Sequence, residues 1–174
     1  MTRLRTEDVA NVELELPEGL SPVLADQRRL VQVLVNLLVN AAEVIEPGVK
    51  REGGRGRIRL VAATQTSQAT DGRPGAPRVT LTVHDSGPGI APQHLQNLFT
   101  PFFTTKPVGK GTGLGLALSR SYMEQMGGKL DAANHPEGGA VFRLELPVFE
   151  PHAIGEPKTR VALDARVVVG AKAA

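Results

Sequence analysis

The amino-acid sequence predicts an α+β domain in which strands and helices share one hydrophobic core. Apolar and polar residues alternate in several short runs, as they do in a half-buried strand. Between residues 30 and 45 apolar side chains instead recur every three or four positions, as on one face of a helix. The 174 residues suit a single domain that is large enough to bury a core.

The composition excludes several classes of function. The formal net charge is only +2, which does not favour binding to nucleic acid or to a membrane surface. With no tryptophan and one tyrosine, the chain lacks an aromatic platform for stacking single-stranded bases, and with no cysteine it cannot form disulfides. The most apolar stretch, residues 30–45, is interrupted by polar side chains and is therefore expected to be an amphipathic helix rather than a membrane span. We expect neither nucleic-acid nor membrane contacts from this chain.

The first strand and the first helix are each indicated by their own pattern. Residues 12–16 alternate between apolar and polar side chains and precede a proline, which is typical of a strand with one buried face. Asp26 stands where a helix N-cap belongs, and we expect the helix to end near Glu46 because Pro47 and Gly48 follow. The apolar stripe of this helix consists of Leu30, Leu34, Leu37, Leu38, Ala41 and Ile45.

Two further strands lead to a carboxylate. Residues 58–63 and 79–83 are rich in apolar and β-branched side chains, which predicts a strand in each. The segment 67–78 between them contains glycine, proline and small polar residues, as is typical of a hairpin connection. The second strand delivers Asp85 at its end.

A long loop and a helix follow this carboxylate. Segment 86–112 is rich in glycine and proline and contains one short helical stretch near residues 92–98, so we expect a mobile, functional loop. Residues 113–126 are expected to be helical and to end at Gly127 and Gly128.

Two last strands, residues 129–133 and 140–146, are expected on either side of a glycine turn at residues 138–139. The sequence therefore places one domain in residues 1–147. Residues 148–174 are expected to be a tail or linker, in which residues 166–169 have a strand-like pattern.

Two groups of side chains, in this order, are typical of an ATP site. Asn36 and Asn40 lie four residues apart on one helix face, so their amide oxygens can reach one magnesium ion. Asp85 can accept a hydrogen bond from the amino group of adenine, and Gly87 and Gly89 allow backbone to approach a flat base. Taken alone, the aspartate could be an ordinary turn residue and the asparagines could be capping or solvent-facing amides.

Four segments resemble the sequence boxes of sensor histidine kinases. Residues 36–41 resemble the N box, residues 85–89 the G1 box, residues 98–103 the F box and residues 111–116 the G2 box. The sequences Phe-Phe-Thr-Thr-Lys at residues 102–106 and Gly-Lys-Gly-Thr-Gly-Leu-Gly-Leu at residues 109–116 are similar to those of the nitrogen-regulatory and dicarboxylate-sensing branch of these kinases. The resemblance covers about residues 10–147. It implies the Bergerat fold of the gyrase, chaperone, histidine-kinase and MutL group (GHKL), a two-layer α/β sandwich with a mixed β-sheet and an ATP lid.

The resemblance also implies a role for each matching residue. Asn36, Asn40 and Lys106 would be catalytic, and Asn40 with Asn36 would bind Mg²⁺. Lys106 and Lys110 would contact phosphates, although either could be an ordinary solvated lysine. Phe99, Phe102 and Phe103 would pack the lid onto the domain, and a helix starting at Gly113 would point its N-terminus at the triphosphate. The residues implied to contact ATP are Asn40, Asp85, Gly87, Gly89, Ile90, Phe99, Lys106, Lys110, Gly111, Thr112, Gly113, Leu114, Gly115 and Leu116.

The chain departs from the family pattern at three places. Thr104 stands where many members carry an arginine. Glu43, which cannot neutralise a phosphate, stands where many carry a lysine. No histidine precedes Asn36 in the sequence. The four histidines, which are expected to be surface or packing residues and not phosphoacceptors, are His84, His94, His135 and His152.

We therefore expect the catalytic domain of a protein-histidine kinase that donates the γ-phosphoryl group of Mg-ATP to a histidine on its own dimerisation and phosphoacceptor domain. Through that domain it would serve a response regulator. The full-length protein is expected to be a cytoplasmic homodimer, or to carry this domain as the cytoplasmic part of a membrane-bound sensor. The alternatives are a GHKL-type ATPase and a nucleotide-binding pseudokinase scaffold. Against the ATPase, Asn36 occupies the position of the family's water-activating glutamate, and an amide cannot act as a general base.

Overall fold

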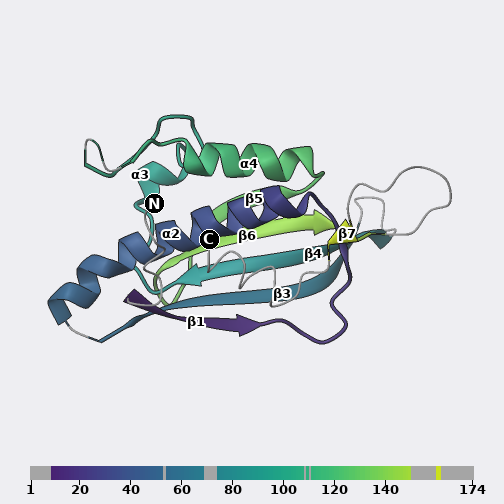
Figure 1. Cartoon of the computed structure of the whole chain (residues 1–174), viewed down its shortest axis with the longest axis horizontal. Coiled ribbons are helices and arrows are strands. Elements are labelled where there is room, and N and C mark those ends of the chain that lie inside the picture. The colour runs from purple at the N-terminus through teal and green to yellow at the C-terminus, as the bar shows by residue number, and fades with distance from the viewer. Residues whose placement is uncertain are drawn as a thin grey trace.

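A mixed five-stranded sheet forms one layer of the molecule (Figure 1). The computed structural model describes residues 9–52, 54–68, 74–107, 109, 111–149 and 160–161. The outer strand β1 runs parallel to β3, and every other neighbouring pair in this sheet is antiparallel. In spatial order the strands are β1 (Ala10–Glu15), β3 (Gly56–Gln68), β4 (Pro74–Asp85), β6 (Ala140–Pro147) and β5 (Lys129–Asn134).

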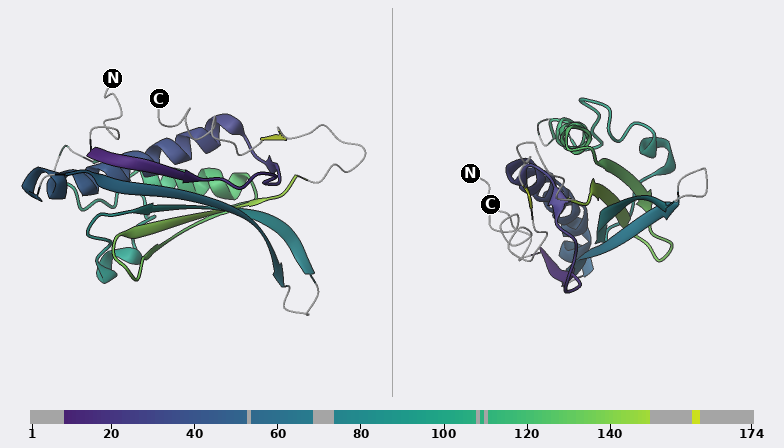
Figure 2. Two further views of the ribbon diagram at one scale, coloured as in Figure 1. Left: turned by 90° about the horizontal axis from the view of Figure 1, so that it is seen from below. Right: turned by 90° about the vertical axis from the view of Figure 1, so that its right-hand side faces the viewer.

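Helices form the second layer. The long helix α2 (Gln27–Glu52) and the helix α4 (Gly115–Gln125) lie on the same face of the sheet, as Figures 1 and 2 show. The short helix α3 (Pro92–Leu95) belongs to the segment that joins β4 to α4. This arrangement confirms the expected α+β class with a mixed sheet.

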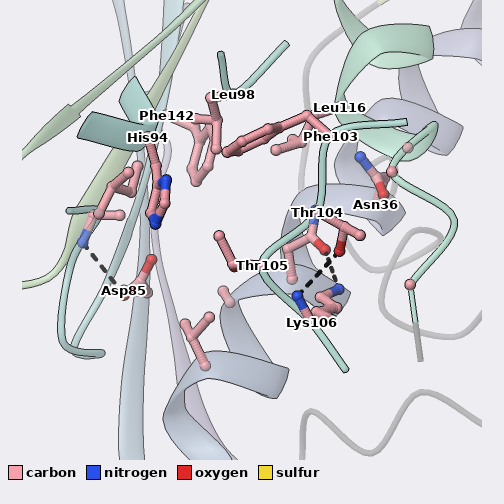
Figure 3. A pocket seen from close by; sticks show the side chains of 18 of the residues that line it. Asn36, Asp85, His94, Leu98, Phe103, Thr104, Thr105, Lys106, Leu116 and Phe142 are labelled. Atoms are coloured by element: carbon pink, nitrogen blue, oxygen red, sulfur yellow. Dashed lines mark hydrogen bonds between the residues drawn. The ribbon is translucent and has the colours of Figure 1, made fainter. Parts of the chain in front are cut away.

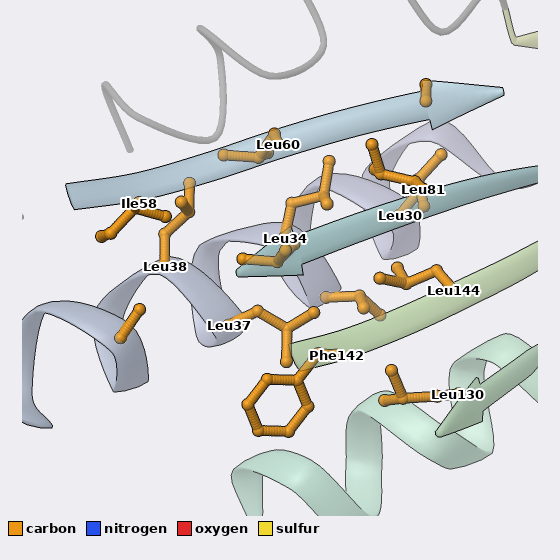
Figure 4. Packing of buried hydrophobic residues seen from close by; sticks show 14 of the residues in the cluster. Leu30, Leu34, Leu37, Leu38, Ile58, Leu60, Leu81, Leu130, Phe142 and Leu144 are labelled. Atoms are coloured by element: carbon orange, nitrogen blue, oxygen red, sulfur yellow. The ribbon is translucent and has the colours of Figure 1, made fainter. Parts of the chain in front are cut away.

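The apolar stripe of α2 forms the centre of the core. Its side chains pack against apolar residues of the three central strands (Figure 4). Burial of one such leucine contributes about 1.5–3 kcal/mol, so this face fixes α2 on the sheet. The buried residues of the stripe are Leu30, Leu34, Leu37, Leu38, Ala41 and Ile45, which confirms the six positions expected from the sequence.

The helix boundaries agree with the sequence in part. Asp26 caps α2, because its Oδ1 accepts hydrogen bonds from the backbone N–H groups of Arg28 at 2.9 Å and Arg29 at 3.1 Å. The expected end near Glu46 was wrong, since α2 continues through Pro47 to Glu52. A proline costs the helix one backbone hydrogen bond, but its fixed φ is itself helical.

The second helix begins later than expected. Gly113 lies outside α4 because its φ of +66° is not helical, and Leu114 is the N-cap of a helix that starts at Gly115. The C-terminal end is confirmed: Gly127 has a φ of +72°, and the Gly128 N–H donates to the carbonyl oxygen of Met123 at 2.8 Å.

Residues beyond the expected domain boundary pair with a short strand near the start of α2. Strand β2 (Val23–Leu24), which the sequence analysis missed, pairs antiparallel with β7 (Arg160–Val161). The Phe149 N–H also donates to the carbonyl oxygen of Pro22 at 2.7 Å. The strand-like run 166–169 lies outside the described residues. None of the described helices has the length and apolar character needed to cross a membrane.

Candidate functional site

A cavity of about 390 Å³ opens between α2, the sheet and the segment joining β4 to α4, which we call the lid (residues 86–114). In Figure 3, Asp85 and His94 lie at one end of the cavity, and Thr104, Lys106 and Asn36 lie at the other. The fold thus brings residues of all four boxes to one place. The predicted site residues that line the cavity are Asn36, Asn40, Asp85, Gly89, Ile90, Lys106, Gly111, Thr112, Gly113, Gly115 and Leu116.

Asp85 is a carboxylate held deep in the protein. Its side chain is almost fully enclosed, with the residue only 3% exposed. Its Oδ1 accepts backbone hydrogen bonds from Gly87 at 2.8 Å and from Ala140 at 3.3 Å, whereas no group in the described ranges donates to Oδ2. Burial raises the pKa of Asp85, and the two backbone donors oppose that rise. One oxygen is therefore fixed by the backbone, and the other remains available to a donor in the cavity.

The loop after Asp85 is fixed by an asparagine that the sequence analysis did not identify. The side chain of Asn134 accepts from the Ile90 N–H at 2.7 Å and donates to the Ile90 carbonyl oxygen at 2.7 Å. A Cβ on Gly89 would lie 2.8 Å from Asn134 Oδ1, so the glycine lets this contact form. Asn134 thereby holds Ile90 at the cavity wall.

The two N-box asparagines have different surroundings. Asn40 Oδ1 accepts a hydrogen bond from the Lys106 ammonium at 3.0 Å. Asn36 instead donates from Nδ2 to Ser119 Oγ on α4 at 3.0 Å. A Cβ on Gly115 would lie 2.4 Å from Asn36 Oδ1, so this glycine allows α4 to approach α2. The structure therefore places Asn40 beside a cation and ties Asn36 to the start of α4.

Lys106 reaches from the lid to α2. Besides contacting Asn40, its Nζ lies 2.5 Å from Glu43 Oε2. The backbone N–H of Lys106 donates to Thr104 Oγ1 at 3.1 Å, which gives the threonine at the family's arginine position a structural role. Lys110, the other lid lysine expected to contact phosphate, lies outside the described residues.

Three predicted residues do not line the main cavity. Phe99 anchors the base of the lid, with its ring centroid 3.9 Å from the guanidinium carbon of Arg120 on α4. Leu114 is the exposed N-cap of α4. Gly87 lines a smaller neighbouring cavity of about 210 Å³.

The sequence analysis also missed part of the cavity wall. His94, which was expected to be a surface or packing residue, lines the cavity, and its ring centroid lies 5.6 Å from that of Phe103. Phe102, which was expected to pack the lid, is 73% exposed. No local pattern distinguishes these aromatic residues from one another. The lining residues outside the predicted set are Ala41, Val44, Ala91, His94, Leu98, Phe103, Thr104, Thr105, Ala140 and Phe142.

The chain is similar to several curated sensor kinases. It is 42% identical over 146 residues to the two-component sensor PprA of Pseudomonas aeruginosa, covering 83% of this chain and 14% of that protein. It is 41% identical to the C4-dicarboxylate transport sensor protein DctB of the same species, covering 85% of this chain and 22% of that protein. It is 40% identical to the sensor histidine kinase ZraS of Salmonella typhimurium, covering 84% of this chain and 28% of that protein. The chain thus spans less than a third of the length of these relatives.

Solved structures and a family model agree with these similarities. The catalytic domain of the histidine kinase ThkA matches with a TM-score of 0.61 and 33% identity, covering 83% of this chain and 84% of that one. Full-length ShkA in complex with AMPPNP matches with a TM-score of 0.62 and 31% identity, covering 84% of this chain and 27% of that one. The model of the family "Histidine kinase-, DNA gyrase B-, and HSP90-like ATPase" matches residues 25–150. This chain is therefore a member of that ATPase family, and it resembles the catalytic domains of sensor histidine kinases within it.

Proposed function

We propose that the cavity binds Mg-ATP, with adenine at Asp85. The observation that carries this proposal is the buried Asp85 carboxylate, which lines the cavity and whose Oδ2 has no donor among the described residues. An ionised carboxylate accepts a hydrogen bond from the exocyclic amino group of adenine. The similarity to ShkA, whose structure contains the ATP analogue AMPPNP, supports the choice of nucleotide.

The triphosphate then extends toward the opposite end of the cavity. Lys106 supplies a positive charge there, and the first turn of α4 presents backbone N–H groups after Gly113. Asn40 suits Mg²⁺, because its side-chain oxygen already accepts from a cation in this structure and amide oxygens are ligands of hard cations. Bound Mg²⁺ would neutralise phosphate charge during phosphoryl transfer.

We further infer that the γ-phosphoryl group passes to a histidine on a separate dimerisation and phosphoacceptor domain, and from there to a response regulator. An exposed apolar surface lies next to the phosphate end of the cavity and suits that domain. It is formed by Phe102, Leu114 and Leu118, which are 73%, 41% and 43% exposed. The Phe102 N–H donates to the Gly113 carbonyl oxygen at 3.0 Å, which holds the aromatic side chain beside the start of α4. The full-length protein would act as a homodimer, with this domain in the cytoplasm.

Calorimetric titration with ATP and GTP tests the adenine site. Guanine carries a carbonyl group where adenine carries the amino group, so an acceptor would face the Asp85 carboxylate. Two hydrogen-bond acceptors that face each other in a buried site cost about 1–3 kcal/mol, which corresponds to roughly 5- to 150-fold weaker binding of GTP. Equal affinities for ATP and GTP would show that Asp85 does not read the base.

The Asn40→Ala variant is expected to lose most of the gain in ADP affinity that Mg²⁺ provides to the parent protein. Alanine has no oxygen to offer the metal, whereas the adenine contacts remain. Dissociation constants for ADP, measured in Mg²⁺ and in EDTA, give the gain for each protein. Asn11→Ala, on the exposed surface of β1, is the matched control and should keep the full gain. An unchanged ratio in Asn40→Ala would remove Asn40 from the metal site.

A further inference from the structure

Two oxygens of α2 converge on one positive charge from the lid. Lys106 Nζ lies 3.0 Å from Asn40 Oδ1 and 2.5 Å from Glu43 Oε2. Asn40 and Glu43 are three residues apart on the helix, so their side chains share one face. Figure 3 shows Lys106 at this end of the cavity.

The lid holds Lys106 in position for this contact. Thr104 Oγ1 accepts the backbone N–H of Lys106 at 3.1 Å, which fixes the turn from which the side chain starts. A Cβ on Gly111 would lie 3.0 Å from Lys106 Cδ, so the backbone of the lid packs against the aliphatic part of the side chain. The side chains of Lys106 and Glu43 are 33% and 45% exposed, so the ammonium group lies partly out of water.

The pair of oxygens has the chemistry of a divalent-cation site. Carboxylate and amide oxygens are ligands of Mg²⁺, which uses one or two protein side chains and completes its shell with water and phosphate oxygens. Glu43 was not among the metal ligands expected from the sequence, and its carboxylate adds the negative charge that Asn40 lacks. An ammonium group and a divalent cation cannot occupy the same two oxygens together.

We propose that Asn40 and Glu43 form a divalent-cation seat, and that Lys106 occupies this seat as a tethered competitor until the metal enters. The assignment of the cation as the Mg²⁺ of Mg-ATP rests on the proposed function. Entry of the metal releases Lys106, whose ammonium group then becomes available to the phosphates. Removal of the Lys106 charge therefore strengthens metal binding at the seat, and removal of the Glu43 charge weakens it.

Paramagnetic broadening by Mn²⁺ tests the seat without nucleotide. Mn²⁺ takes the same oxygen ligands as Mg²⁺, and it broadens the amide NMR signals of nearby residues even when binding is weak. In the parent protein the signals of residues 40–43 are followed during a Mn²⁺ titration. In Lys106→Met these signals should broaden at about two- to fivefold lower Mn²⁺ concentration, the factor that a partly exposed ion pair supplies. Lys129→Met makes the same change of charge at an exposed position on β5 and should behave like the parent.

The double variant Lys106→Met/Glu43→Gln separates the seat from general attraction of cations. The double variant should lose the increase in Mn²⁺ affinity that Lys106→Met produces, because the amide of glutamine is a weaker, uncharged ligand. Lys106→Gln repeats the test if methionine disturbs the lid. Equal broadening in Lys106→Met and in the double variant would show that Glu43 is no ligand. An equal response of Lys106→Met and Lys129→Met would show that Lys106 does not compete. Both results are independent of ATP binding, which the ATP and GTP titrations measure separately.

Discussion

The Asp85→Asn variant is expected to lose most of its affinity for ATP and to remain folded. The introduced asparagine can keep an oxygen toward the backbone N–H groups of Gly87 and Ala140, which hold Asp85 Oδ1 in the parent. Its NH₂ group then faces the amino group of adenine, so two donors meet where a donor met an acceptor. The loss of this buried hydrogen bond should weaken binding by about 10- to 100-fold or more. Calorimetry with ADP measures the affinity, and thermal unfolding measures the stability.

The pH dependence of the free energy of unfolding, compared between the parent and Asp85→Asn, tests whether burial disfavours the charged form of the Asp85 carboxylate. Burial raises the pKa of Asp85 in the folded protein, so the folded state holds this proton more tightly than the unfolded state does. The contribution of Asp85 to the free energy of unfolding therefore falls as the pH rises from the ordinary pKa of an aspartate through the raised pKa of the folded protein. This contribution is least favourable at neutral pH. Asp85→Asn should lack this pH dependence and be at least as stable as the parent at pH 7.

A surface carboxylate provides the control for both measurements. Asp131 lies on β5 with its side chain 64% exposed, so Asp131→Asn should change neither ADP affinity nor the pH profile appreciably.

In the parent, ADP affinity should also fall as pH decreases through the raised pKa of Asp85, because the protonated group is a poorer acceptor. Full ADP affinity in Asp85→Asn would place the base elsewhere in the cavity.

The Gly139→Ala variant is expected to be strongly destabilised and to lose nucleotide affinity with it. A Cβ on Gly139 would lie 1.7 Å from the backbone carbonyl oxygen of Asp85, so the end of β4 has to move. Gly139 also has a φ of +84°, which an alanine adopts only with strain. Overpacking and backbone strain together should lower the free energy of unfolding by about 2–5 kcal/mol.

The neighbouring glycine isolates the steric part of this effect. Gly138 has a φ of +101°, but a Cβ there meets no atom within 4 Å. Gly138→Ala should therefore lose only about 1–2 kcal/mol of stability and should keep ADP affinity in the folded protein. Chemical denaturation of both variants gives the two free energies. Equal losses would show that the contact between Gly139 and Asp85 has no energetic consequence.

Local patterns in the sequence were sufficient for the framework of the fold. The helical period of residues 30–45 identified the buried face of α2, and Asp26 identified its start, because both signals depend on residues within a few turns of one another. The continuation of α2 past Pro47 was missed, since a proline weakens a helix without always ending it.

The site depended on contacts between distant segments. The boxes contain most of the residues that line the cavity, because each box carries its own glycines and polar residues. The clamp of Asn134 on Ile90 and the pair of Glu43 with Lys106 join residues 44 and 63 positions apart. Neither pair has a local signal, so only the packing of the lid and of β5 against the rest of the domain reveals them.

Transfer of label from γ-labelled ATP tests the central claim most directly. The chain is incubated with Mg²⁺, γ-labelled ATP and the phosphoacceptor domain that we propose as its partner, and an acceptor with its histidine replaced by glutamine serves as control. We predict acid-labile label on the acceptor histidine, none on this chain alone, and a loss of labelling in Asp85→Asn and Asn40→Ala. Labelling of this chain in the absence of the acceptor would contradict the account. So would ATP binding without any transfer to the acceptor histidine, which would indicate a nucleotide-binding scaffold.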